Sequence, residues 1–216
     1  MEVSHRHFQA VIAHISNGCV MKKLMILCLF AIGANVHAEK LNWHEGSIVL
    51  TNEKVVEGEI SLDPAHDHIL LRKDGSITIY TASKIKSFLF YDVEKNANHK
   101  FISLKDHQTT KTQNHFYEVV LRGKASILCQ PKPGYEQETS RNFDHNFNYY
   151  VSLNNQLIDL NKFRKQVFPI ILQSHADQVT AFMYQNHLNP NFQDSDIKII
   201  EFYNRLENSN TFANNP

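Results

Sequence analysis

The stretch that decides the fold is VVEGEISL, residues 55–62, in which polar and apolar residues alternate. Side chains of a β-strand point alternately to opposite faces, so Val56, Ile60 and Leu62 share one apolar face with Gly58. A glycine on an apolar face gives up packing and is typical of a bulge or a sharply coiled strand. We therefore expect a strand here, in a sheet that curls at Gly58 into a small barrel-like form.

Similar short runs with period-2 alternation continue on both sides of this strand. The strands predicted from this pattern are 47–50, 55–62, 68–72, 76–80, 85–91, 100–104, 116–121, 125–130, 149–153 and 156–158. Turn-forming residues separate them, as in Asp74-Gly75 and Asn154-Asn155. Nearly all the connections are too short for a crossover helix, so the pattern predicts an antiparallel meander.

The strand 85–91 is apolar on both faces. Ile85, Leu89 and Tyr91 point one way, whereas Phe88 and Phe90 point the other way. One face can line the curled sheet, and the other then needs a cover.

That cover is predicted from residue 159 onward, where the apolar period becomes helical. DLNKFRKQVFP (159–169) is expected to end at Pro169, and SHADQVTAFMYQNHLNP (174–190) opens with a capping box of Ser174 and Asp177. DSDIKIIEFYNRLEN (194–208) carries a stripe formed by Ile199, Phe202, Tyr203 and Leu206. The sequence thus predicts an α+β fold, a curled antiparallel sheet covered by about three C-terminal helices.

An export signal is predicted at residues 21–38, MKKLMILCLFAIGANVHA. Lys22 and Lys23 precede an apolar run, and small residues precede a cleavage site after Ala38. Because a signal works from the N-terminus, we interpret 1–20 as a misassigned extension and Met21 as the start. The predicted product is exported, periplasmic or secreted, and has no transmembrane anchor after cleavage.

The remaining chain divides by pattern into an antiparallel β domain at 39–158, a helical section at 159–207 and a disordered tail at 208–216. It carries 19 basic and 21 acidic residues. This near-neutral charge argues against nucleic acid as a partner.

Cys129 is the one cysteine left after cleavage, so an internal disulfide is excluded. It alternates with Ile127 on a predicted strand, which indicates a buried, inert thiol.

Five segments together resemble a family of exported, functionally uncharacterised, β-rich proteins of Gram-negative bacteria. They are GSIVLTNEKVVEGEISL, KIKSFLFYD, FYEVVLRGKASIL, DLNKFRK and IIEFYN, which occur in this order along the chain. The resemblance implies a β-rich domain with a helical C-terminal section, and it carries no active site to transfer. It says nothing about the segment 131–148, which is longer than the family pattern.

The turn DPAHDH contains the candidate metal ligands Asp63, His66, Asp67 and His68. Carboxylate and imidazole groups suit a transition metal. The same residues are also ordinary turn formers, and four ligands from one tight turn seldom reach a common centre, so a solvated turn is the favoured interpretation.

Catalytic motifs are missing from the sequence: it contains neither H-E-x-x-H nor G-x-S-x-G, and no phosphate-binding loop. We therefore expect a non-enzymatic structural or binding module of the bacterial envelope, without a cofactor. The alternative is a metal-dependent or otherwise unrecognised envelope hydrolase.

The segment 131–148, PKPGYEQETSRNFDHNFN, is the predicted partner contact, because it is far longer than a hairpin requires. Tyr135, Phe143 and Phe147 are its candidate binding residues, large apolar groups that gain free energy when a partner covers them. The expected partner is an unidentified envelope protein, peptide or glycan. A mobile insert without a partner is the other interpretation.

Overall fold

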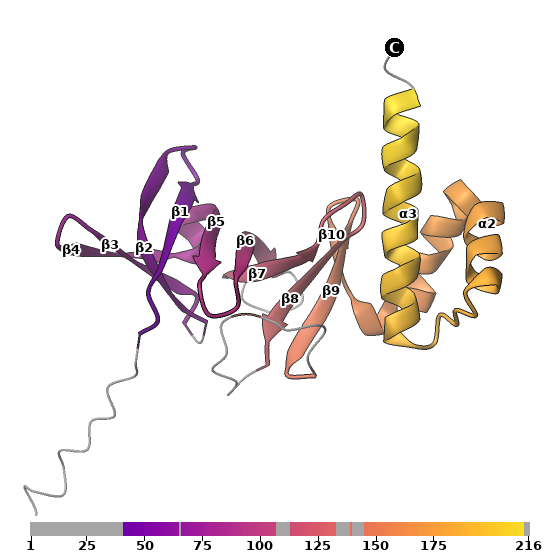
Figure 1. The fold of residues 1–216 in the computed structure, drawn as a ribbon, viewed down its shortest axis with the longest axis horizontal. Helices are drawn as coiled ribbons and strands as arrows, with labels where there is room; N and C mark the ends of the chain where they lie inside the picture. Colours follow the sequence, from indigo (N-terminus) through magenta and orange to yellow (C-terminus); the bar gives the residue numbers. More distant parts are fainter. Residues whose placement is uncertain (1–40, 65, 107–112, 133–138, 140–144, 214–216) are drawn as a thin grey trace, which may run out of the picture. The chain divides into compact units, whose positions relative to one another are not determined.

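The computed structural model describes residues 41–64, 66–106, 113–132, 139 and 145–213 (Figure 1). From Asn42 onward the chain belongs to one compact unit. The predicted N-terminal extension and export signal, residues 1–38, lie outside the described residues.

Within the described residues, ten antiparallel strands form one open sheet. They are β1 (His44–Leu50), β2 (Val55–Asp63), β3 (His68–Lys73), β4 (Ser76–Thr81), β5 (Ile85–Asp92), β6 (Ala97–Asp106), β7 (Gln113–Leu121), β8 (Ser126–Pro131), β9 (Phe147–Leu153) and β10 (Gln156–Asp159). Their order is β10-β9-β8-β7-β6-β5-β1-β2-β3-β4. The predicted strands and the α+β class are confirmed, and the sheet is not closed into a barrel.

The order departs from a simple meander at one connection. The short 3-10 helix η1 (Ala82–Lys84) leads from the edge strand β4 back to β5, which pairs with β1. The Ala82 N–H donates to the Asp67 carbonyl oxygen (3.1 Å), so η1 runs past the start of β3. Turn chemistry alone predicts neighbouring pairing and therefore missed this return.

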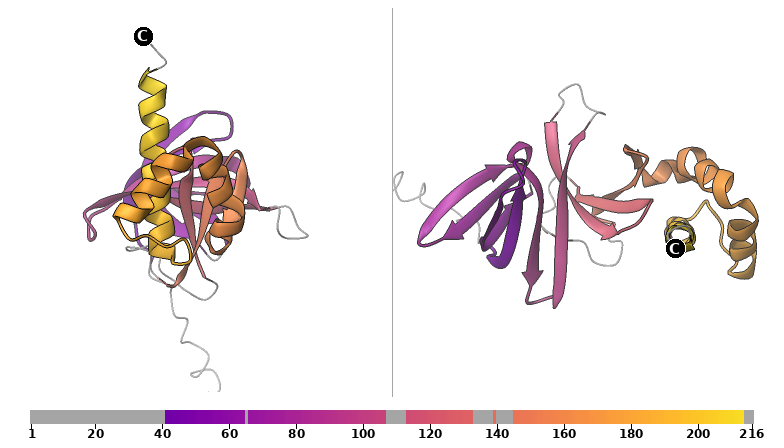
Figure 2. Two further views of the ribbon diagram at one scale, coloured as in Figure 1. Left: turned by 90° about the vertical axis from the view of Figure 1, so that its right-hand side faces the viewer. Right: turned by 90° about the horizontal axis from the view of Figure 1, so that it is seen from above.

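The first core forms where the sheet coils on itself (Figure 2). It joins buried side chains of β1, β2, β3, β5, β6 and β7 with Ala82 of η1. Phe88 of β5 and Phe116 of β7 have β6 between them in the sheet, yet their ring centroids are only 5.1 Å apart. Strands two places apart in a flat sheet are separated by roughly 9.5 Å, so this contact reports strong coiling.

Two glycines make the coiling possible. Gly46 and Gly58 are register partners in β1 and β2. A Cβ atom on Gly58 would lie 2.6 Å from the Arg72 carbonyl oxygen, and one on Gly46 would lie 2.4 Å from that of Leu89. No side chain fits at such distances, which explains the glycine on the apolar face of β2.

A bulge in β5 corrects the predicted faces of that strand. Between Val49 and Leu50 the register shifts, so that Ile85 lies opposite Leu50 while Ser87 lies opposite Val49. The extra residue turns Ile85 to the core, where it is 1% exposed with Phe88 and Phe90, while Leu89 and Tyr91 stay on the opposite, exposed face.

The helical section contains the 3-10 helix η2 (Leu160–Lys162), the π-helix η3 (Phe163–Val167), α2 (Phe168–Gln185) and α3 (Gln193–Ala213). Pro169 occupies the first turn of α2, where its missing N–H costs nothing, so it opens a helix rather than ending one. The predicted boundary at Ser174 survives only as a kink at His175 (φ −143°, ψ 39°). Neither α2 nor α3 has, in the part described, the length and apolarity of a membrane-spanning helix.

The helix α3 continues to Ala213, beyond the predicted end of the helical section at residue 207. The predicted disorder of 208–216 is therefore wrong for 208–213, and 214–216 lie outside the described residues. No proline or glycine interrupts 208–213, and the Ser209 hydroxyl donates to the Arg205 carbonyl oxygen (2.9 Å) within the helix.

The helices cover the C-terminal strands of the sheet (Figures 1 and 2). A second core joins β8, β9 and β10 to the helical section, with Ile127, Val151, Ile171, Val179 and Ile199 all 0% exposed. Phe88 and Phe90 belong to the first core, so the expectation that the helices cover them is wrong. The coiled sheet covers them itself.

One side chain fixes α3 to the hairpin between β7 and β8. The Asn204 amide accepts from the Ala125 N–H (Oδ1, 2.9 Å) and donates to the Ala125 carbonyl oxygen (Nδ2, 2.9 Å). Both residues are buried. A Cβ atom on Gly123 would lie 2.2 Å from the Asn204 Cγ, so glycine leaves room for this amide.

We predict that Asn204→Leu lowers the free energy of unfolding, because it leaves two buried backbone groups without partners, at about 1–3 kcal/mol each. Urea denaturation measures the change. Asn208→Leu, one turn later on the exposed side of α3, is the matched control and should cost little. Gly123→Ala should lower the free energy of unfolding less in an Asn204→Ala background than in the native chain, because the added Cβ atom then has no amide to meet. Equal losses in the two backgrounds would contradict the packing described.

Candidate functional site

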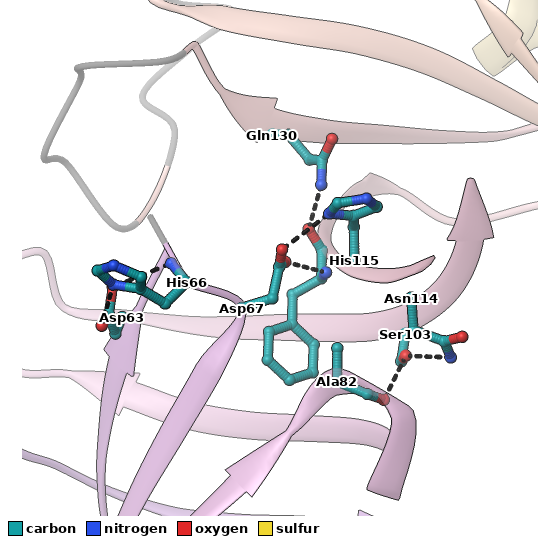
Figure 3. Close-up of polar contacts among 9 residues, drawn as sticks. Asp63, His66, Asp67, Ala82, Ser103, Asn114, His115 and Gln130 are labelled. Carbon is teal, nitrogen blue, oxygen red and sulfur yellow. Dashed lines mark hydrogen bonds and ion pairs between the residues drawn. The ribbon is translucent and has the colours of Figure 1, made fainter. Parts of the chain in front are cut away.

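The predicted metal turn separates into two pairs in the structure (Figure 3). Asp63, the last residue of β2, lies 2.8 Å from His66 through Oδ2 and Nδ1. Asp67 turns away from them, and its Oδ2 lies 2.8 Å from His115 Nδ1 on β7. His68 opens β3 opposite Asp63, and its ring centroid lies 6.3 Å from that of His66, so Asp67 alone points away from the other three candidates. Within the described ranges no cluster of three or more His, Cys, Asp or Glu side chains could hold a metal ion.

Asp67 has a structural task that the sequence did not reveal. Its Oδ1 also accepts the Phe116 N–H of β7 (3.0 Å), and its backbone lies in the left-handed region (φ 53°), which Asp tolerates better than most residues. In Figure 3 these contacts join the β2–β3 turn to β7, although β2 and β7 are well separated in the sheet order. The Asp67 carboxylate thus stabilises the coiled form of the sheet around the first core.

Further hydrogen bonds surround this contact in Figure 3. The Ser103 hydroxyl donates to the Ala82 carbonyl oxygen (2.7 Å) and accepts from Asn114 (3.0 Å). The Gln130 amide donates to the Phe116 carbonyl oxygen (3.0 Å). These side chains satisfy backbone groups and one another, which favours a structural role over a reactive one.

We predict that Asp67→Ala lowers the free energy of unfolding by about 1–3 kcal/mol, because the Phe116 N–H loses its acceptor. Asp63→Ala removes the exposed contact with His66 and should lower the free energy of unfolding by only about 0–1 kcal/mol. Thermal and urea melts measure both. A Zn²⁺-dependent rise in melting temperature, lost in His66→Ala and in Asp67→Ala alike, would contradict the structural interpretation and restore the metal site.

A buried ionisable group lies between the two cores. Glu118 of β7 is the register partner of Phe101 in the first core and of Cys129 in the second. Its Oε1 lies 2.6 Å from His99 Nδ1, and the Cys129 thiol donates to its Oε2 (3.6 Å). All three residues are at most 7% exposed, so the predicted burial of Cys129 is confirmed.

A polar cluster continues from this group toward the β5–β6 turn. Burial alone would raise the pKa of Asp92, but the Lys95 N–H (3.1 Å) and ammonium (3.4 Å) lower it below its usual value. Lys95 also contacts the hydroxyl of Thr139, which is 1% exposed. Burial lowers the pKa of His44, whose ring stacks on Phe90 at 4.6 Å.

Asp196 is a further buried carboxyl, in the first turn of α3. It is 6% exposed, and its Oδ1 has no hydrogen-bond partner among the described residues. Burial raises its pKa to about 7. A carboxyl of this kind suits a general acid, but burial is the one cause of its raised pKa and no other titratable group among the described residues contributes to it, so we assign it no reaction.

The predicted partner residues of the segment 131–148 divide in two. Tyr135 and Phe143 lie outside the described residues. Phe147 opens β9, is 3% exposed and belongs to the second core, so its assignment as a partner contact is wrong. The alternation of the strand that follows, Phe147 with Tyr149 and Val151, is the signal that could have placed it inside.

The outward face of the coiled sheet combines exposed apolar side chains with a groove. Ser47 is the register partner of both Glu57 and Leu89, so these residues share a face. Glu45, two residues before Ser47, and Tyr91, two residues after Leu89, lie on the same face. A shallow groove of about 490 Å³ runs over β1, β2, β5 and β6, lined among others by Glu45, Glu57, Glu59, Leu89, Tyr91 and Asn98. Leu89 and Tyr91 are 40% and 39% exposed.

The electrostatics of this groove are acidic. Arg72 neutralises Glu59 through two hydrogen bonds (2.6 and 2.7 Å) and lies 4.3 Å from the centroid of the Trp43 ring. Glu45 and Glu57 form no ion pair within the described part of the chain. The lining contains no basic residue.

No family model, curated protein or solved structure matches this chain significantly.

Proposed function

We propose that this protein is an exported, non-enzymatic binding module of the bacterial envelope. Its outward face over β1, β2, β5 and β6 holds a polypeptide segment that carries basic and apolar side chains. The export signal expected at residues 21–38 supports the compartment, and the acidic groove supports the class of ligand.

The observation that carries the proposal is the pairing of exposed apolar groups with carboxylates in one groove. Leu89 and Tyr91 offer apolar contact area, and the Tyr91 hydroxyl is held by Asn96 in the β5–β6 turn. Glu45 and Glu57 offer negative charge on neighbouring strands. Desolvated aromatic anchors rimmed by charge are the usual composition of a protein-binding surface.

A polypeptide fits this groove better than a nucleic acid does. Nucleic acid would meet carboxylates where it requires cations. Lysine and arginine side chains combine an apolar stem with a cationic end, so they complement Leu89 and Glu57 at the same time.

Among the described residues, the hydrolase alternative has no comparable arrangement. His99, Glu118 and Cys129 are near one another but buried, and none of them lines the groove. In the Asp63–His68 turn, Asp67 points away from the other candidate ligands toward His115. Binding therefore has the better geometric support.

The test uses two short synthetic peptides, one alternating lysine and leucine and one alternating glutamate and leucine. Trp43 is the single tryptophan of the chain, so its fluorescence reports binding near Arg72. We expect the lysine peptide alone to bind, and Glu45→Lys/Glu57→Lys to weaken it about ten-fold or more.

Glu201→Lys on the exposed side of α3 is the matched control and should leave the affinity unchanged. Tyr91→Ser should weaken binding without altering the charge. Equal binding of both peptides, or equal loss in the α3 control, would contradict the proposed site.

The compartment has its own test. If translation starts at Met21 and the signal is cleaved after Ala38, the native protein recovered from cells has the intact mass of residues 39–216. A native mass that includes residues 1–20 would contradict both the start and the export.

A further inference from the structure

Among the described strands, β4 ends the sheet with an edge that pairs with no other strand. Five of its six residues are exposed, with Ile77 at 55% and Ile79 at 62%. The sequence SITIYT contains no charge and no proline, the devices that usually prevent an edge from pairing. The opposite edge is different: β10 has four residues, ends in Asp159 and leads directly into η2.

The hairpin geometry shows which backbone groups face this open edge. Asp74 and Gly75 both have positive φ (49° and 74°), the signature of a two-residue type I′ turn, and Lys73 is the register partner of Ser76. Such a turn is closed by a hydrogen-bonded pair, and the pairs then alternate. Ser76, Thr78 and Tyr80 therefore bond to β3, while Ile77, Ile79 and Thr81 direct their N–H and C=O groups outward.

We propose that β4 pairs antiparallel with β4 of a second copy, giving a symmetric dimer with a continuous sheet. The proposal is separate from the peptide-binding function and does not depend on it. Its basis is the local symmetry of Ile77-Thr78-Ile79. A two-fold axis at Thr78 places Ile77 of each copy opposite Ile79 of the other copy, which gives two equivalent Ile77–Ile79 pairs.

This register satisfies the backbone and the side chains together. Both Ile77–Ile79 pairs fall at hydrogen-bonded positions, so each exchanges two N–H···O bonds. The four isoleucines lie on one face, where cross-strand β-branched pairs stabilise a sheet. No charge on β4 meets its own copy, which is the usual obstacle to self-pairing. A foreign strand could use the same backbone groups, but it would have to supply this matching pattern.

Sedimentation velocity of the mature chain tests the dimer. Because a single edge strand buries less area than a standard interface, we expect the mass to rise about two-fold across the micromolar range. Ile79→Lys should remain monomeric throughout, while Val93→Lys, which removes an exposed apolar residue from the β5–β6 turn, should dimerise like the native chain.

A second variant reports the register even if Ile79→Lys folds poorly. Thr78 lies at a non-hydrogen-bonded position opposite its own copy, where Cα atoms are about 4.5 Å apart, within disulfide range. Oxidised Thr78→Cys should therefore form a covalent dimer, whereas Thr81→Cys should not. A native chain that stays monomeric overturns the proposal, as does a dimer that survives Ile79→Lys and gives no Thr78 cross-link. Selective retention of a foreign extended peptide on monomeric β4 also overturns it.

Discussion

The Asp67 carboxylate holds the start of β3 against β7 across the four strands that separate them in the sheet order. The first core depends on this contact, because a flat sheet would leave Phe88, Phe101 and Phe116 on an open surface. In the coiled sheet, the inner faces of the N-terminal strands pack against one another. The helices can then pack only where the sheet opens again, over β8–β10, and the Asn204 amide fixes them there.

Period-2 alternation located all ten strands because side-chain direction in a strand is a local property. The same alternation does not predict contacts between residues far apart in the chain. Asp67 and His115 are 48 residues apart, and a turn residue that caps a distant strand has the same sequence pattern as a solvated turn or a metal ligand. The bulge in β5 placed Ile85 on the face opposite to the predicted one. Pro169 was expected to end a helix, but a proline has the same local signature in the first turn of a helix as after its last turn.

The sequence pattern predicted the partner contact in the long segment 131–148 and not on the outward face, for a physical reason. Aromatic residues in a polar loop are conspicuous, whereas Leu89 and Tyr91 alternate with core residues and read as part of the core. Only the register brings them beside Glu45 and Glu57. Ile77 and Ile79 lie on this same face, since their partners on β3 are Arg72 and Leu70. A sheet extended through β4 would carry two acidic grooves on one surface.

The two cores divide the chain at a single point. The buried residues of the first lie between Ile48 and Phe116, and those of the second lie between Ala125 and Tyr203. A chain that emerges N-terminus first from a ribosome or a translocation channel can therefore complete the first core before any residue of the second appears. Its unburied apolar surface at any moment is limited to one core, which restricts the time and the area available for aggregation. The order of synthesis and the order of burial coincide in this fold.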